Sequence, residues 1–147
     1  MKIKKITKKI IGWREWVSFP ELGIKQIKAK IDTGARTSAL HAFNIELFKN
    51  NQNKNKVRFQ INPIQRNKNY VLHCEADLLD KRNVKNSGGD IEARYIIITN
   101  LYMGSKSWPI ELTLTNRDAM GFRLLLGRTA INKNFLINPH RSFLINN

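Results

Sequence analysis

The segment AKIDTGARTSALHA, residues 29–42, places a lone aspartate between a strand pattern and a tight turn. The residues before it alternate apolar side chains with lysines up to Ile31, which is the two-residue period of a β-strand with one buried face. Asp32 then ends the strand, and Gly34 allows a turn and a close approach of another backbone segment. An aspartate at a turn commonly hydrogen-bonds its own backbone. At this point both a structural and a chemical role for Asp32 are open.

The same two-residue alternation recurs along the chain and predicts an all-β fold. It is seen in VRFQI (57–61) and IELTL (110–114), while short apolar runs at 94–99 and 122–127 predict strands buried on both faces. Turn-forming residues separate these runs at 50–55, 86–90 and 103–107. Many short strands with regular turns favour a small barrel or sandwich. Only two short helical segments are predicted, around 129–134 and at 36–41.

Length and composition fit one globular domain over residues 1–147, with residues 1–12 as a flexible basic N-terminus. The apolar stretch near this basic start is too short for a signal peptide, and none approaches the ~20 residues of a membrane helix. The single cysteine, Cys74, excludes an internal disulfide framework. We therefore expect a cytoplasmic protein that does not enter a membrane.

The net charge of +15 favours anionic partners such as nucleic acid or acidic peptides. An ordinary solvated basic surface is the alternative. No acidic residue occurs between Glu46 and Glu75, whereas six cationic residues do: Lys49, Lys54, Lys56, Arg58, Arg66 and Lys68. Aromatic residues are sparse in this stretch, so it does not resemble a base-stacking surface. Nucleic acid is thus a candidate partner but not the favoured one.

The Asp-Thr-Gly-Ala motif, together with LLLGR at 124–128, resembles the retropepsin-like aspartic peptidases. The resemblance extends to a bacterial branch known as ATP-dependent zinc peptidases, often encoded beside RimK-type ligases. The matching segments are 14–24, 28–42, 82–97 and 110–128. The resemblance implies a small closed barrel of the acid-protease type with one short C-terminal helix, in which the late apolar strand packs under the Asp-Thr-Gly loop.

The resemblance also implies a catalytic role for Asp32, with Thr33 and Gly34 shaping its loop. Aspartic peptidases use two carboxylates, one to take a proton from water and one to protonate the carbonyl oxygen. This chain has one such aspartate, so the resemblance implies a homodimer in which two copies of Asp32 meet across a two-fold axis.

A second implied element is the segment RNVKNSGGDIEARY (82–95), which resembles a flap that closes over substrate. Two glycines at its tip would give it freedom to move; a plain surface hairpin with surface ion pairs is the alternative. The residues expected to contact substrate, in the loop, the flap and the late strand, are Ala35, Arg36, Arg82, Gly88, Gly89, Glu92, Arg94 and Arg128.

Several arginines fall in the segments that are expected to form the cleft. Arg36, Arg123 and Arg128 are predicted to cluster and to accept an acidic peptide end, because an arginine fork suits a carboxylate. The alternative is a structural network in which they pair with Glu111 and Asp118.

The family label suggests zinc and ATP, but the residues do not support either. The candidate zinc ligands are His41, His73, Cys74 and His140, without HExxH or CxxC spacing. No phosphate-binding loop of the GxxxxGK[ST] type occurs. We therefore expect no metal site and no cofactor.

Together these features predict a homodimeric aspartic peptidase that hydrolyses peptide or protein substrates, including acidic tails of the kind that RimK-type ligases add. A different class remains open: a non-catalytic basic module that binds acidic peptides or ribosomal RNA. Loss of function on Asp32→Asn would favour the enzyme, and steep salt dependence would favour the nucleic-acid binder. A structural barrel with a coincidental turn aspartate is the third reading.

Overall fold

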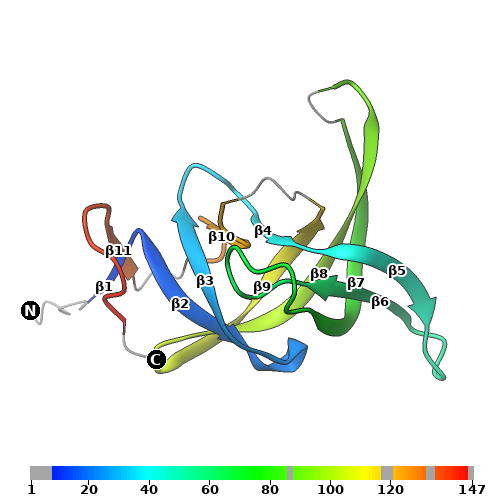
Figure 1. Cartoon of the computed structure of the whole chain (residues 1–147), viewed down its shortest axis with the longest axis horizontal. Helices are drawn as coiled ribbons and strands as arrows, with labels where there is room; N and C mark the ends of the chain where they lie inside the picture. The colour runs from blue at the N-terminus through cyan, green and yellow to red at the C-terminus, as the bar shows by residue number, and fades with distance from the viewer. Residues whose placement is uncertain (1–7, 86–87, 117–120, 132–134, 146–147) are drawn as a thin grey trace, which may run out of the picture.

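The computed structural model describes residues 8–85, 88–116, 121–131 and 135–145, and these residues form a β-rich fold (Figure 1). The one helical element among them is a single 3₁₀ turn at Pro20–Leu22. The strands are β1 (Lys9–Gly12), β2 (Arg14–Phe19), β3 (Ile24–Asp32), β4 (Ser38–His41), β5 (Phe43–Lys49), β6 (Asn55–Ile61), β7 (Leu72–Lys85), β8 (Ile91–Met103), β9 (Lys106–Thr115), β10 (Leu124–Gly127) and β11 (Phe135–Asn138).

Six strands form a closed barrel in the order β2-β3-β10-β4-β9-β8. Ser18 of β2 pairs with Tyr102 of β8 and closes it. Beyond β8 the sheet continues through β7 and β6 to β5, and a separate two-stranded sheet pairs β1 with β11. The prediction of an all-β fold with a small closed barrel is therefore confirmed.

The barrel closes around the apolar faces that the sequence pattern predicts. Ile27, Ala29 and Ile31 of β3 are buried, and the lysines between them are not. The apolar positions of VRFQI and IELTL are buried in the same way. Ile98 departs from the prediction for 94–99, because its side chain is 45% exposed on the outer face of β8.

The two predicted helical segments are not helical where the structure describes them. Residues 38–41 form β4, whose backbone is paired on both sides by β9 and β10. Residues 129–131 of the predicted C-terminal helix form a turn, because Thr129 bonds to the carbonyl of Arg36 through its backbone N–H and through its hydroxyl. Residues 132–134 lie outside the described residues.

The N-terminal segment is partly ordered by the C-terminal one. Residues 9–12 form β1, which runs parallel to β11 and lies beside it at the left of Figure 1; residues 1–7 are outside the described part of the chain. The carboxylate of Glu15 is fully buried and accepts hydrogen bonds from the backbone N–H groups of Gly12, Leu144 and Ile145 at 2.6, 2.9 and 3.1 Å. One carboxylate therefore joins both ends of the described chain to the barrel.

Two hairpins project from the barrel on the side away from β1 and β11 (Figure 1). The longer one, β7–β8, is the hairpin predicted from the 82–95 segment, and it is paired from Lys85↔Ile91 down to Leu78↔Ile97. The other is β5–β6, which turns at Asn50–Asn53.

Candidate active site

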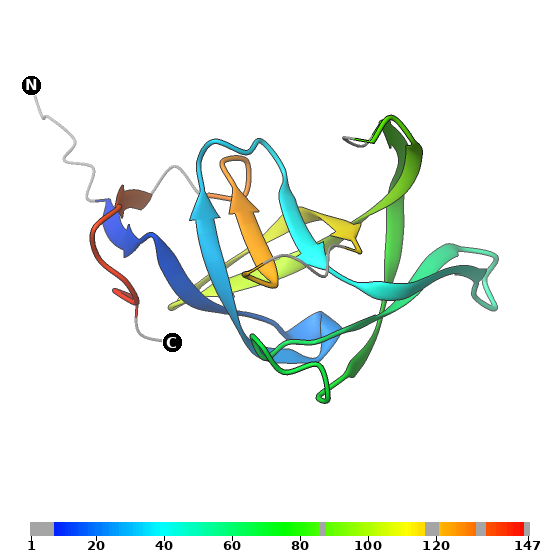
Figure 2. The same cartoon turned by 45° about the horizontal axis from the view of Figure 1, so that its top comes forward.

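Asp32 is the last residue of β3, and its side chain is half-buried. The residues that follow form a turn in which the N–H of Ala35 donates to the carbonyl of Asp32 at 3.2 Å. Figure 2 shows this β3–β4 loop arching over the end of β10. Thr33 and Gly34 lie exposed at the top of the loop. The turn therefore presents a carboxylate at the end of a buried strand, with its neighbours open to solvent.

The end of β10 supports the loop from below. The N–H of Arg128 donates to the carbonyl of Ala35 at 2.8 Å, and the N–H of Gly127 donates to the Ser38 hydroxyl at 3.0 Å. A Cβ added at Gly127 would lie 2.7 Å from the carbonyl of Thr37, so only glycine fits here. The resemblance implied this packing of the late strand under the Asp-Thr-Gly loop, and the structure confirms it.

Gly34 has a different environment. Among the described residues, the only neighbour within 4 Å of a Cβ added there is Oδ1 of Asp32, at 3.4 Å, which is an ordinary contact distance. The close approach of another backbone segment that the sequence suggested for Gly34 is therefore not seen in this part of the chain.

A cleft of about 710 Å³ begins at the residues that follow the Asp32 turn. It brings together Arg36 of the loop and Arg82 of the β7–β8 hairpin, both predicted to contact substrate. Sequence reasoning did not select the other lining residues for substrate contact, because only the barrel topology brings β9 and the turn after β10 to this place. They are Thr37, Pro109, Ile110, Glu111 and Thr129.

The outer half of the hairpin, three residue pairs below the last pair at its tip, places two arginines directly opposite each other, Arg82 on β7 and Arg94 on β8. Like charges in this position repel. Each is paired along its own strand, Arg82 with Asp80 at 3.0 Å and Arg94 with Glu92 at 3.7 Å. The ion pairs expected for a plain surface hairpin, the alternative to a substrate-binding flap, are therefore present. Arg82 nevertheless lines the cleft.

The hairpin tip carries the two glycines predicted to give it freedom. Gly88 and Gly89 belong to the turn that leads into β8, and Gly89 has a φ of 87°, which favours glycine. Residues 86 and 87 of the same turn lie outside the described part of the chain.

The predicted arginine cluster is only partly formed. Arg128 follows Gly127 and donates from Nη1 to the carbonyl of Gly34 at 3.3 Å, next to Arg36 and Thr129. Arg123 precedes β10, four residues before Gly127, and is buried rather than in the cleft. Asp118, the other predicted partner, lies outside the described residues.

The candidate metal ligands lie on separate elements. His73 is exposed and Cys74 is buried on the opposite face of β7, His41 is buried at the end of β4, and His140 is in an exposed turn near the C-terminus. Among residues 8–85, 88–116, 121–131 and 135–145, no group of three His, Cys, Asp or Glu side chains gathers. Burial raises the pKa of the Cys74 thiol to about 11.

In those same ranges no helix is long and apolar enough to span a membrane.

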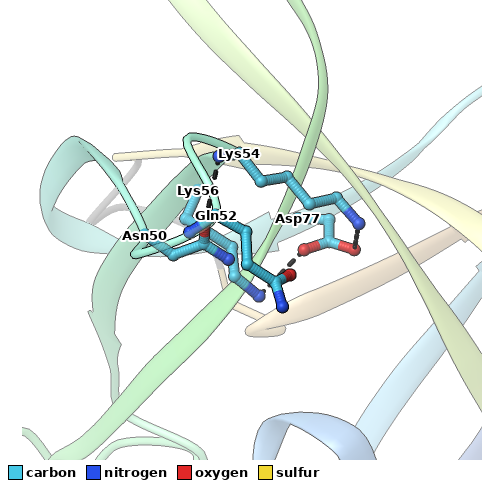
Figure 3. Close-up of polar contacts among 5 residues, drawn as sticks. All are labelled: Asn50, Gln52, Lys54, Lys56 and Asp77. Atoms are coloured by element: carbon cyan, nitrogen blue, oxygen red, sulfur yellow. Dashed lines mark hydrogen bonds and ion pairs between the residues drawn. The ribbon is translucent and has the colours of Figure 1, made fainter.

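Three cations of the basic stretch 46–75, namely Lys54, Lys56 and Arg58, lie close to acidic side chains. Figure 3 shows Lys54 and Lys56 converging on Asp77, each with its Nζ 2.8 Å from a carboxylate oxygen. Arg58 lies over the ring of Phe48 and 3.9 Å from Glu75. These pairs reduce the cationic surface that the β5–β6 hairpin offers to phosphates.

Comparisons with known proteins agree with the geometry. A family model described as retropepsin-like aspartic endopeptidase RimB matches residues 10–147. Two similar proteins, from Shewanella halifaxensis and Desulfotalea psychrophila, are each named probable alpha-L-glutamate ligase; they are 48% and 50% identical to the chain over 92% and 91% of its length. The chain spans only 30% and 29% of those relatives.

One solved structure also has this fold. It is the crystal structure of a Legionella pneumophila protein of unknown function, which matches with a TM-score of 0.76 and 29% identity. The match covers 92% of this chain and 97% of that one.

Proposed function

Since the chain belongs to the RimB-like family of retropepsin-like aspartic endopeptidases, we propose that it hydrolyses peptide bonds with a water activated by Asp32 and by Asp32 of a second copy. The observation that carries the proposal is the way in which the surrounding strands and loop hold Asp32. Its carboxylate ends a buried strand, its loop is fixed by the end of β10, and the same loop contributes Arg36 to a cleft that Arg82 also lines.

The two carboxylates would share the proton transfers. The ionised one accepts a proton from water as the water oxygen bonds to the substrate carbonyl carbon, and the protonated one donates to the carbonyl oxygen. The C–N bond then breaks as a proton passes to the amine nitrogen. No metal or other cofactor is needed for these steps.

A second copy is part of the proposal because each chain supplies one such aspartate. Thr33 and Gly34 are exposed at the top of the loop, and among the described residues a Cβ added at Gly34 would meet only Oδ1 of Asp32. A two-fold dimer would bring identical loops together and place both carboxylates at its axis.

The substrate that we propose is an acidic peptide or protein tail. Arg36 and Arg82 face one cleft, and guanidinium groups bind carboxylates in a bidentate fashion. The similar proteins are named for glutamate ligation, which supports an acidic substrate and a shared pathway with a RimK-type ligase. One unpaired cysteine supports a cytoplasmic location.

The alternative of a non-catalytic module for acidic peptides or ribosomal RNA rests on the net charge of +15. The ion pairs of Lys54, Lys56 and Arg58 weaken it. RNA affinity through phosphates would fall steeply between low and moderate salt, and it would not depend on Asp32.

Cleavage of a peptide library by the wild-type chain tests the proposal, with Asp32→Asn as the matched control. We expect cleavage at peptides rich in glutamate or aspartate and none with the variant. Equal cleavage by both proteins, or binding without cleavage by either, would contradict the proposed function.

A further inference from the structure

A second pocket, of about 420 Å³, is formed by β2 and β3 together with the loop after β6 and the residues before β10. Three cationic side chains line it, Arg14, Lys28 and Arg66. The remaining lining residues are Trp13, Gln65 and Phe122. We call it the Arg66 pocket. Because the three cationic residues form its wall, a ligand inside the pocket meets them directly.

Aromatic rings, rather than carboxylates, hold two of these cations. The guanidinium of Arg14 lies 4.7 Å from the centroid of the Trp13 ring, and Nζ of Lys28 lies 5.2 Å from that of Trp16. Among the residues that the structure describes, no ion pair involves Arg14, Lys28 or Arg66. Their positive charge is therefore not neutralised in the described part of the chain.

The strand register adds a further cation beside the pocket. Arg14 of β2 is directly opposite Lys30 of β3, which is exposed. Like charges in directly opposed positions repel. Nε of Arg14 donates to the hydroxyl of Ser142 at 3.1 Å, and within the described residues the two terminal nitrogens have no hydrogen-bond partner. An anion bound here would supply acceptors for these nitrogens and offset the repulsion.

The loop that carries Arg66 is tied to the residues before β10. The side-chain amide of Gln65 donates to the carbonyl of Gly121. The next residue, Phe122, meets the Trp13 ring edge-on, with a centroid separation of 5.8 Å and an interplanar angle of 76°. These contacts hold an exposed arginine at the opening of a pocket whose other cations are half-buried.

The Arg66 pocket and Asp32 lie on the same face of β3. Lys28, Lys30 and Asp32 alternate with the buried residues Ala29 and Ile31. The four residues from Lys28 to Asp32 span about 13 Å. An extended peptide that passes Asp32 therefore needs about four residues to reach the pocket, with Lys30 on the way.

A carboxylate suits the pocket better than a nucleotide does. Guanidinium groups bind carboxylates with two parallel hydrogen bonds. Proteins that bind single-stranded RNA offer aromatic rings on which bases stack, whereas the Trp13 ring already contacts Arg14 and Phe122. The face shared with Asp32 favours the carboxylates of a peptide over the phosphates of RNA.

We propose that the Arg66 pocket binds a carboxylate side chain of the peptide substrate, about four residues from the bond held over Asp32. This inference rests on the proposed function. It makes Arg66 and Lys28 specificity-determining residues. It also predicts a preference for peptides with glutamate or aspartate at a position remote from the cleaved bond.

The test measures binding of fluorescently labelled hexaglutamate to the full chain carrying Asp32→Asn, so that turnover does not interfere. Adding Arg66→Gln or Lys28→Gln should weaken binding by about fivefold each, and adding both by more than about tenfold. Lys49→Gln, at an exposed position at the end of β5, removes the same charge and should change binding by less than about twofold. Hexaglutamine, the neutral counterpart, should bind equally to all of these variants.

Arg66 is exposed, so Arg66→Gln should keep the melting temperature of the parent chain and report on binding alone. Equal losses in Arg66→Gln and Lys49→Gln, or no loss in either Arg66→Gln or Lys28→Gln, would overturn the inference. Hexauridylate that binds more tightly than hexaglutamate, with the same dependence on Arg66, would overturn it in favour of an RNA site.

Hydrolysis is measured separately on chains that keep Asp32. There Arg66→Gln should raise KM for glutamate-rich peptides and leave kcat unchanged. If hexaglutamate binding depends on Arg66 but the wild-type chain cleaves no peptide, the proposed function fails and the carboxylate pocket stands. If cleavage depends on Asp32 but neither binding nor KM depends on Arg66, the pocket fails and the peptidase stands.

Discussion

Gly127 lies directly opposite Asp32 where β10 runs parallel to β3, and the carbonyl of Thr37 crosses 2.7 Å from the position that a Gly127 Cβ would occupy. The strand that ends in Gly127 and the loop that follows Asp32 are thus one structural unit. Its backbone hydrogen bonds hold the loop, and the absence of a side chain at Gly127 lets the loop cross.

Two glycine substitutions should distinguish an effect on the stability of the fold from an effect on the proposed peptidase activity. Gly127→Ala should lower the free energy of unfolding by about 2 kcal/mol or more, because the added methyl group overlaps backbone atoms of Thr37. In Gly34→Ala the added methyl group meets, among the described residues, only Oδ1 of Asp32, at 3.4 Å. This variant should leave the free energy of unfolding, from chemical denaturation, nearly unchanged while reducing peptidase activity. A stable, active Gly127→Ala protein would contradict the role given to β10.

The buried carboxylate of Glu15 should dominate the stability of the chain ends. Glu15→Ala leaves the N–H groups of Gly12, Leu144 and Ile145 without their acceptor. We expect a loss of about 3 kcal/mol or more in unfolding free energy, from urea denaturation. Glu46→Ala, at an exposed position on the edge strand β5, is the control and should change stability by less than about 0.5 kcal/mol. Similar effects of both variants would refute this role for Glu15.

Cys74 should be unreactive while the protein is folded. Its thiol donates to the carbonyl of Leu22 and its pKa is raised to about 11 by burial, so the thiolate is scarce at pH 8. A thiol reagent such as DTNB should react at least about tenfold more slowly with the native chain than with the chain in urea. Equal rates would show that Cys74 is accessible in the native state.

The Asp77 ion pairs predict a small acid-side loss of stability. Hydrogen bonds from Lys54, then Lys56, lower the pKa of the Asp77 carboxyl below its ordinary 3.8. Because the folded-state pKa is the lower one, the stabilisation is present above pH 3.8 and is lost as the pH falls through the folded-state pKa. The carboxylate is 39% exposed, so screening limits the contribution to less than about 1 kcal/mol.

The measurement compares wild type with Asp77→Asn in urea denaturation at pH 6 and at pH 2.5. The difference in unfolding free energy should shrink at the lower pH. A difference that grows on acidification would contradict the assignment of these ion pairs.

The barrel strands could be predicted because their inward faces repeat every second residue, as in Ile27, Ala29 and Ile31. The Asp32 loop and its support by Gly127 could be predicted from the resemblance. Residues 38–41 were predicted as helix because a four-residue stretch of Ser, Ala, Leu and His has no clear period, and its pairing with β9 and β10 decides its conformation.

The lining of the cleft could not be predicted for a related reason. Arg36, Arg82 and Glu111 are distant in sequence, and only the pairing of β4 with β9 and of β8 with β7 and β9 brings them to one cleft.

The most direct test of the central claim mixes wild-type chain with increasing amounts of Asp32→Asn chain and measures the rate of acidic-peptide hydrolysis at fixed wild-type concentration. A site built from two copies of Asp32 predicts that the rate falls as mixed dimers replace wild-type dimers, in proportion to the fraction of wild-type pairs. A rate that stays constant across the series, with the wild-type chain monomeric by sedimentation at the same concentration, would show that one chain acts alone and would contradict the shared two-aspartate site.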